Sequence, residues 1–111
     1  MNTQEIISEQ VTTNPVVLYM KGTPENPQCG FSAHAVKILD ACGASNIFTV
    51  DVLPNPEIRQ GIKEYSNWPT IPQIFIKGEF IGGCDIVKDM FETGEMRQFL
   101  DSNGIETEAQ N

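Results

Sequence analysis

The spacing of apolar and polar residues divides the first half of the chain into alternating helices and strands. Residues 1–13 place Ile7 and Val11 at helical spacing, and Asn14-Pro15 ends that helix. Residues 15–20 (PVVLYM) form a continuous apolar run, which predicts a strand buried on both faces. Residues 21–28 contain two prolines and a glycine, so we expect a loop there.

A second helix is predicted from Cys29, because apolar residues then recur every three or four positions until Gly43. Residues 47–52 (IFTVDV) predict another strand, parallel to the first because a crossover helix separates the two. Asn55 is suited to cap the next helix with Pro56 in its first turn, and this helix is expected to reach about Tyr65.

The second half predicts a hairpin followed by two helices. Residues 73–77 and 79–81 flank the turn signal Lys77-Gly78. Residues 85–92 are amphipathic, Gly94 breaks the pattern, and a last short helix runs to Leu100. We therefore expect one domain over residues 1–104 and a flexible polar tail over residues 105–111.

This order of elements predicts an α/β fold. A parallel β-α-β unit joined to an antiparallel hairpin gives a four-stranded mixed sheet flanked by helices, which is compatible with a thioredoxin-like fold. The first helix is an addition at the N-terminal side of that unit. Topology alone names no function.

The charge balance excludes some classes of partner. Seven Lys and Arg stand against fifteen Asp and Glu, so the net charge is −8, and such a field repels nucleic acid. No apolar run approaches the roughly 20 residues of a membrane span, so no membrane is expected. A secretory signal requires Lys or Arg before its apolar residues, and the start of this chain has none there. We therefore expect a cytoplasmic protein.

Candidate chemistry centres on Cys29, one of three cysteines. It lies where the 21–28 loop becomes a helix, and the helix start stabilises a thiolate over a thiol. Lys21, at the end of the first strand, adds a positive charge across the loop. The position of a second redox cysteine, three residues on, holds Ser32, so any disulfide that Cys29 forms must be resolved by a thiol from elsewhere.

Four segments carry a resemblance to a known family: Lys21, Cys29-Gly30-Phe31-Ser32, Trp68-Pro69-Thr70-Ile71-Pro72-Gln73 and Gly82-Gly83-Cys84-Asp85. In this order and spacing the chain resembles a single-domain monothiol glutaredoxin of the CGFS class, over about residues 14–100. The resemblance implies a thioredoxin-like fold, a cis bond between Ile71 and Pro72, and glutathione as ligand.

The chemistry of these residues suits a ligand with two carboxylates, an ammonium, an extended backbone and a thiol, and glutathione has this set of groups. Lys21 and Arg59 suit a clamp for one carboxylate, although a helical arginine is more often simply solvated. Asp85 suits a helix cap, a partner for the ammonium, or both. By resemblance, the residues that bind glutathione are Lys21, Arg59, Ile71, Cys84 and Asp85.

The remaining cysteines and the single histidine have simpler interpretations. Cys42 falls on the apolar face of its helix and is expected in the core. Cys84 either resolves a disulfide with Cys29 or, as we favour, has a structural place beside the site. A zinc site is disfavoured, because His34 lies about 140° around the helix from Cys29.

Two functions follow. The resemblance implies a 2Fe–2S cluster bridging a homodimer, with Cys29 and glutathione as ligands, and cluster storage and transfer to acceptor proteins, with a BolA-like protein as a further partner. The alternative is a glutathione-dependent thiol–disulfide oxidoreductase, at most a weak enzyme, that removes glutathione from mixed disulfides. The long, proline-bearing loop between Lys21 and Cys29 resembles the loop of the cluster-binding class, and this resemblance favours the carrier. A pure interaction module would need no special cysteine.

Overall fold

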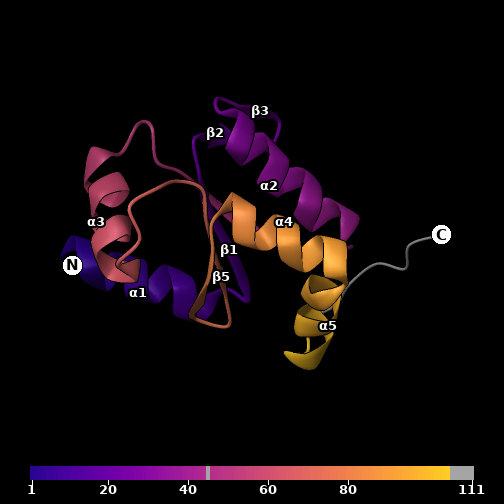
Figure 1. Cartoon of the computed structure of the whole chain (residues 1–111). Helices are drawn as coiled ribbons and strands as arrows, with labels where there is room; N and C mark the ends of the chain where they lie inside the picture. The colour runs from indigo at the N-terminus through magenta and orange to yellow at the C-terminus, as the bar shows by residue number, and fades with distance from the viewer. Residues whose placement is uncertain (45, 106–111) are drawn as a thin grey trace.

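In a computed structural model, which describes residues 1–44 and 46–105, a four-stranded sheet separates two groups of helices (Figure 1). The helices are α1 (Thr3–Thr13), α2 (Gly30–Ala41), α3 (Pro56–Ser66), α4 (Cys84–Thr93) and α5 (Glu95–Ser102). The strands are β1 (Val16–Met20), β2 (Gly22–Thr23), β3 (Asn26–Pro27), β4 (Phe48–Asp51), β5 (Gln73–Ile76) and β6 (Glu79–Gly82).

The main sheet has the strand order β4-β1-β5-β6. Strand β1 pairs with β4 in parallel, with Val17 opposite Phe48, whereas β1–β5 and β5–β6 are antiparallel. The predicted mixed sheet, its parallel first pair and its closing hairpin are therefore confirmed. Strand β1 is central, and all five of its residues are buried, as its continuous apolar run predicts.

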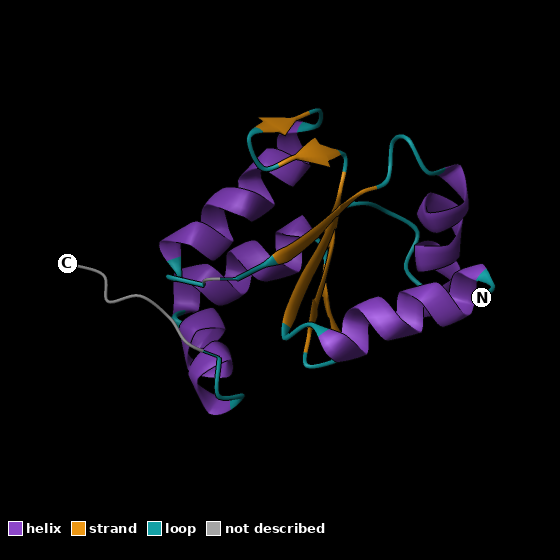
Figure 2. Cartoon of the chain, turned by 180° about the vertical axis from the view of Figure 1, so that it is seen from behind, coloured by secondary structure: helices purple, strands orange, loops and turns teal. Residues whose placement is uncertain are grey.

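Each face of the sheet carries its own core. Figures 1 and 2 show α2, α4 and α5 on one face and α1 with α3 on the other. Alternate residues of β1 divide between the faces: Leu18 packs in the cluster under α2 and α4, and Tyr19 in the cluster under α1 and α3. The end of β1 thus lies between the two helical layers, where α2 and the segment after α3 both reach it.

Helices α1 and α3 approach each other closely at Gly61. A Cβ atom at this position would lie only 2.5 Å from the Thr3 Cγ2 methyl and 3.1 Å from Ile7 Cδ1. The Gln4 side chain donates a hydrogen bond to the Gly61 carbonyl at 3.0 Å. The extra N-terminal helix is therefore fastened to the domain through a contact that only glycine permits.

The segment between Lys21 and Cys29 is more ordered than the predicted loop. Strands β2 and β3 form a small hairpin in which Gly22 pairs with Pro27. Gly22 has φ +91°, and a Cβ atom there would lie 2.6 Å from the Asn26 carbonyl oxygen. Asp51 Oδ1 accepts hydrogen bonds from the N–H groups of Gly22 and Leu53, both at 3.0 Å, and so ties the hairpin to the end of β4.

Ile105, the first residue of the predicted tail, packs against the domain. Ile105 is buried among the residues under α5, and its N–H donates to the Leu100 carbonyl at 3.0 Å. The remainder of the predicted tail, residues 106–111, lies outside the described residues. Within the described part of the chain, no helix has the length and apolar character needed to cross a membrane.

Candidate functional site

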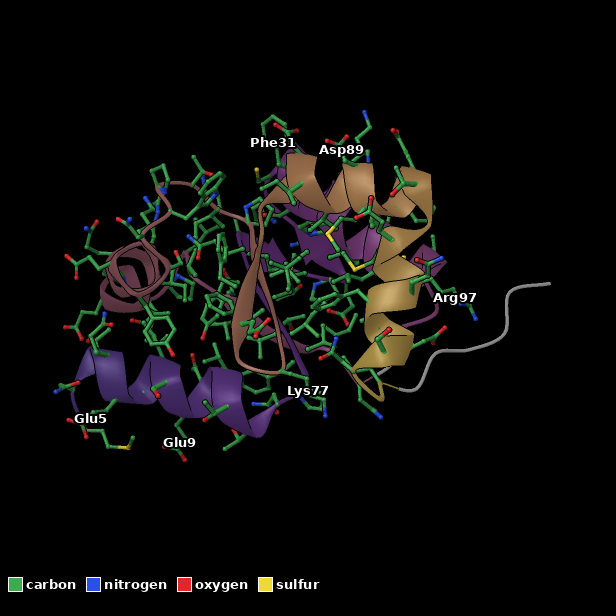
Figure 3. The ribbon with its side chains drawn as sticks, turned by 60° about the horizontal axis from the view of Figure 1, so that its bottom comes forward. Glu5, Glu9, Phe31, Lys77, Asp89 and Arg97 are labelled. Atoms are coloured by element: carbon green, nitrogen blue, oxygen red, sulfur yellow. The ribbon has the colours of Figure 1, made fainter. Side chains whose placement is uncertain are left out.

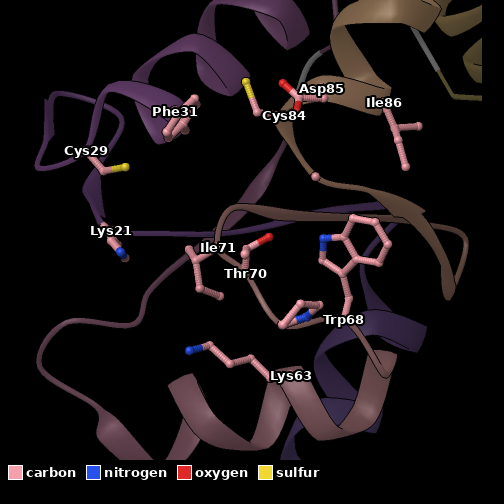
Figure 4. Close-up of a pocket in the computed structure, with 12 residues that line it drawn as sticks. Lys21, Cys29, Phe31, Lys63, Trp68, Thr70, Ile71, Cys84, Asp85 and Ile86 are labelled. Carbon is pink, nitrogen blue, oxygen red and sulfur yellow. The ribbon is translucent and has the colours of Figure 1, made fainter.

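A pocket of about 420 Å³ opens where α2, α4 and the segment after α3 meet (Figure 4). Cys29 and Lys21 form one side, Trp68 the opposite side, and Cys84 and Asp85 the edge at the start of α4. The lining residues are Lys21, Cys29, Phe31, Lys63, Trp68, Pro69, Thr70, Ile71, Gly83, Cys84, Asp85 and Ile86. Four of the five predicted glutathione-binding residues and the predicted nucleophile thus surround one cavity.

Cys29 is the N-cap residue of α2 and is half-buried. Its pKa is lowered, first by the backbone N–H of Ser32, against the opposing effect of burial, then by the N–H of Phe31, the charge of Lys21 and the Ser32 hydroxyl. The sulfur is therefore set among donors that favour its charged form, and the thiolate is the form of cysteine that can act as a nucleophile or bind a metal.

Ser32 is fully buried one turn into α2. Its Oγ accepts a hydrogen bond from the Lys21 N–H at 3.1 Å, which joins the end of β1 to the start of α2. The residue that replaces a second cysteine therefore has a structural task of its own.

The other two cysteines have the opposite acid–base character. Burial is the main cause that raises the pKa of the Cys84 thiol, and the nearby charges of Asp85 and Cys29 raise it further. Cys42 is buried, as predicted for a core residue, and burial raises its pKa too. Both therefore keep their protons to a higher pH than Cys29 does, so Cys84 is an available but unactivated thiol beside the site.

Two lysines bring positive charge to the pocket. Lys21 comes from the end of β1, and Lys63 reaches in from α3 on the side away from Cys84 (Figure 4). Arg59, the predicted partner of Lys21, is half-buried one helical turn before Lys63 and does not line this cavity. The sequence analysis missed Lys63; the four-residue spacing, which places both cations on one face of α3, is the signal that would have suggested it.

The wall between the lysines and Trp68 is the segment that connects α3 to β5. The Ile71–Pro72 bond is cis, as the resemblance implies. Gln73, fully buried, donates from Nε2 to the carbonyls of Trp68 at 3.0 Å and Thr70 at 3.1 Å. The backbone around Ile71 is thereby held at the pocket surface.

The opposite edge is the start of α4. Gly83 is the N-cap residue there and no side chain caps the helix, so the interpretation of Asp85 as a cap is wrong. Asp85 is exposed in the first turn, directly after Cys84. The helix start leaves N–H groups available for a carboxylate, while the Asp85 carboxylate is available to a cation.

One large apolar side chain, Phe31, stands exposed at the edge of the pocket. Figure 3 shows Phe31 at the surface on the same side of the molecule as Asp89 of α4, whereas Glu5 and Glu9 lie on the outer side of α1, on the opposite side. Phe31 is 64 % exposed although it is a large apolar side chain. Lys21 and Lys63 are the cations among the lining residues, and Asp85 is the carboxylate among them.

The chain matches the family model described as Glutaredoxin over residues 16–81. It is 51 % identical over 98 residues to Glutaredoxin 4 of Escherichia coli, covering 88 % of this chain and 84 % of that protein. It is 52 % identical over 99 residues to a Synechocystis protein named an uncharacterized monothiol glutaredoxin, covering 89 % and 92 % of the two chains.

Solved structures agree with the sequence matches. A monomeric truncated mutant of Trypanosoma brucei 1-C-Grx1 superimposes with a TM-score of 0.87 at 40 % identity, covering 99 % of this chain and 98 % of that one. A buckwheat glutaredoxin–glutathione complex superimposes with a TM-score of 0.79 at 25 % identity, covering 93 % and 91 % of the two chains.

Proposed function

The chain belongs to the glutaredoxin family as a monothiol member, and on this premise we propose that it binds glutathione and carries a 2Fe–2S cluster between proteins. In this proposal two copies of the chain hold the cluster between them. Acceptor apoproteins, which receive the cluster, and a BolA-like protein are its expected partners in a reducing compartment such as the cytoplasm.

The chemistry of the pocket supports glutathione as the ligand. Lys21 and Lys63 offer charge to one carboxylate, and the N–H groups at the start of α4 offer a second anion site. The Asp85 carboxylate suits the ammonium group, and the backbone of Ile71 suits the extended peptide. The buckwheat relative, similar over nearly its whole length, forms a complex with glutathione.

The supply of thiolates supports a cluster shared by two chains. Such a cluster usually takes four thiolates. Within residues 1–44 and 46–105, no three His, Cys, Asp or Glu side chains gather into a metal site. Cys29 has a lowered pKa and Cys84 a raised one, so each chain offers one ready thiolate. Two chains and two glutathione thiols complete the set, and the pocket beside Cys29 would hold one glutathione per chain.

A single observation carries the proposal: Cys29, whose pKa is lowered, stands beside a pocket of about 420 Å³, while the position three residues on is a buried serine. The thiolate therefore has no second cysteine in its own helix with which to close a C-x-x-C disulfide, and Cys84 beside it has a raised pKa. A cysteine binds a metal as a free thiolate, whereas in a dithiol mechanism the second cysteine would convert that thiolate into a disulfide.

The lowered pKa of Cys29 also favours a second, weaker candidate, thiol–disulfide exchange. The Cys29 thiolate would attack the glutathione sulfur of a mixed disulfide and release the protein thiolate. A second glutathione thiolate would then attack the new Cys29–glutathione disulfide, regenerating the Cys29 thiolate and releasing oxidised glutathione. Because Ser32 stands in place of a resolving cysteine, every turnover needs a second glutathione from solution, so we expect exchange to be slow.

Reconstitution with iron, sulfide and glutathione tests the proposal. The wild type should give a coloured dimer that passes its cluster to an apo-ferredoxin-like acceptor, and Cys29→Ser should give a colourless monomer. Cys84→Ser is the matched control and should keep the colour. Full iron content in Cys29→Ser, or brisk disulfide turnover without a transferable cluster in the wild type, would contradict the carrier function.

A further inference from the structure

Gln73 is a polar residue in a place where the sequence pattern calls for an apolar one. It opens strand β5, lies opposite Tyr19 of β1, and is fully buried together with the rest of the strand. By strand alternation its side chain faces the same side as Phe75, toward the core under α1 and α3. A buried amide in such a position needs hydrogen-bond partners to be tolerated.

Only the nitrogen end of the Gln73 amide has hydrogen-bond partners. Both hydrogens of Nε2 are used, on the carbonyl oxygens of Trp68 and Thr70. The other end of the amide, Oε1, is buried and has no hydrogen-bond partner within the described residues. Because carbonyl oxygens only accept, the nitrogen must face them, and the orientation of the amide is fixed by its partners.

This imbalance indicates what Gln73 is for. A methionine or leucine would fill the same volume without an unpaired acceptor, so the amide is unfavourable for packing alone. What only the amide provides is the pair of hydrogen bonds to the segment after α3. That segment contains Pro69 and Pro72, which have no N–H, so its backbone has few donors with which to fix itself.

The segment that Gln73 holds is a wall of the candidate site. Trp68, Pro69, Thr70 and Ile71 are consecutive and all line the pocket. Figure 4 shows Thr70 and Ile71 between Lys21 and Trp68, facing the cavity. The carbonyls of Trp68 and Thr70 point instead toward the core, because they accept from Gln73 there.

We propose that Gln73 is the positioning residue of this wall: its buried amide fixes the carbonyls of Trp68 and Thr70 and thereby sets where the Ile71 backbone meets a bound glutathione. The role toward glutathione rests on the function proposed above; the role in fixing the wall does not. Gln73 touches no ligand and acts only through the segment before it.

Gln73→Met is the direct test, because methionine keeps the length of the side chain and removes both donors. Gln73→Leu is a second apolar replacement in case methionine packs badly. Ile76→Val is the matched control, since Ile76 is equally buried in the same strand but lies on the opposite face, in the other core. It reports what a small loss of packing in β5 does to the site.

The first readout uses the protein without ligand. Trp68 is the single tryptophan, so its emission and acrylamide quenching report on the wall, and amide exchange at Thr70 and Ile71 reports on its order. Both signals should change in Gln73→Met and Gln73→Leu and stay at wild-type values in Ile76→Val. Unchanged Trp68 and amide signals in both Gln73 variants would overturn the proposal.

The second readout is a glutathione titration followed by NMR, with melting temperatures measured alongside. The Gln73 variants should bind glutathione about five- to tenfold more weakly, the equivalent of one ordinary hydrogen bond. Ile76→Val shows how much glutathione affinity is lost for a given loss of melting temperature. If the Gln73 variants lose affinity only in that same proportion, Gln73 is a plain structural residue. If the wild type binds no glutathione, the proposed function fails, while the ligand-free signals still decide the role of Gln73.

Discussion

The Ser32 hydroxyl accepts a hydrogen bond from the backbone N–H of Lys21 at 3.1 Å. This bond joins the strand that supplies a pocket lysine to the helix that presents Cys29. The same hydroxyl also helps to lower the pKa of Cys29. One buried serine thus connects the cation, the thiol and the scaffold of the site.

Replacing Ser32 with alanine should therefore raise the pKa of Cys29 and destabilise the fold. The loss should be about 1–3 kcal/mol, because the Lys21 N–H loses its partner in a partly buried place. Thiolate absorbance against pH and thermal unfolding measure the two effects. Ser66→Ala removes a comparable hydrogen bond, to the Ile62 carbonyl at 2.9 Å, and should leave the Cys29 titration unchanged.

The opposite pKa shifts of Cys29 and Cys84 predict an order of alkylation. Only thiolates react, and a lowered pKa means that Cys29 is already ionised at a pH where Cys84 still holds its proton. Iodoacetamide near neutral pH should modify Cys29 first, and Cys84 should follow only as the pH rises above the ordinary thiol range. Peptide mass spectrometry checks this order. Faster modification of Cys84 at neutral pH would contradict the assignment of Cys29 as the ready thiolate.

The pocket lining predicts that Lys63 contributes more to glutathione binding than Arg59 does. Lys63→Ala should weaken glutathione binding by about 1–3 kcal/mol if it makes a charge-assisted bond, and Lys21→Ala by a similar amount. Lys37→Ala, an exposed lysine on α2, is the charge-matched control. A larger loss in Arg59→Ala than in Lys63→Ala would restore the original prediction of an Arg59 clamp.

Gly61→Ala should loosen the N-terminal helix. The added methyl would lie 2.5 Å from Thr3 Cγ2, so we expect a loss of about 1–3 kcal/mol in the free energy of unfolding. Gly30→Ala is the control, because nothing lies within 4 Å of its Cβ position. Adding Thr3→Ser to Gly61→Ala removes the clashing Cγ2 methyl and should recover part of the loss in a urea titration.

The hairpin before Cys29 predicts a trade between the two candidate functions. Gly22→Ala cannot keep φ +91° or the approach to the Asn26 carbonyl without strain, so the hairpin should lose its present geometry. If that geometry suits a held cluster rather than in-line attack, the variant should lose its cluster faster and exchange disulfides faster than the wild type. If the variant is less stable but does not exchange disulfides faster than the wild type, this link is contradicted.

The outline of the fold was accessible from the sequence because its signals are local. The apolar run of β1, the helical spacing after Cys29 and the Lys77-Gly78 turn each specify an element without reference to the rest of the chain. The spacing of the apolar residues after Cys29 likewise predicts that Cys29 lies at a helix start, and its lowered pKa follows from that position.

The features that the sequence analysis missed depend on contacts between distant segments. Helical spacing places Arg59 and Lys63 on one face of α3 but does not say which of them reaches the pocket. The hairpin β2–β3 has two-residue strands with no periodic pattern, and Asp51, far along the chain, holds it in place. Ile105 follows a glycine among polar residues, and only the packing under α5 shows that it belongs to the core.

In the proposed carrier, ionic strength acts in opposite directions on two association steps, the pairing of two copies and the capture of glutathione beside Lys21 and Lys63. The chain carries a net charge of −8, so two copies approaching each other repel, and salt eases their pairing by shortening the Debye length from about 30 Å at 0.01 M to about 8 Å at 0.15 M. The same ions compete with Lys21 and Lys63 for an anionic tripeptide. Assembly of the proposed cluster should therefore be fastest at an intermediate salt concentration. There the tripeptide still binds strongly, and the repulsion between two copies of the chain is already screened.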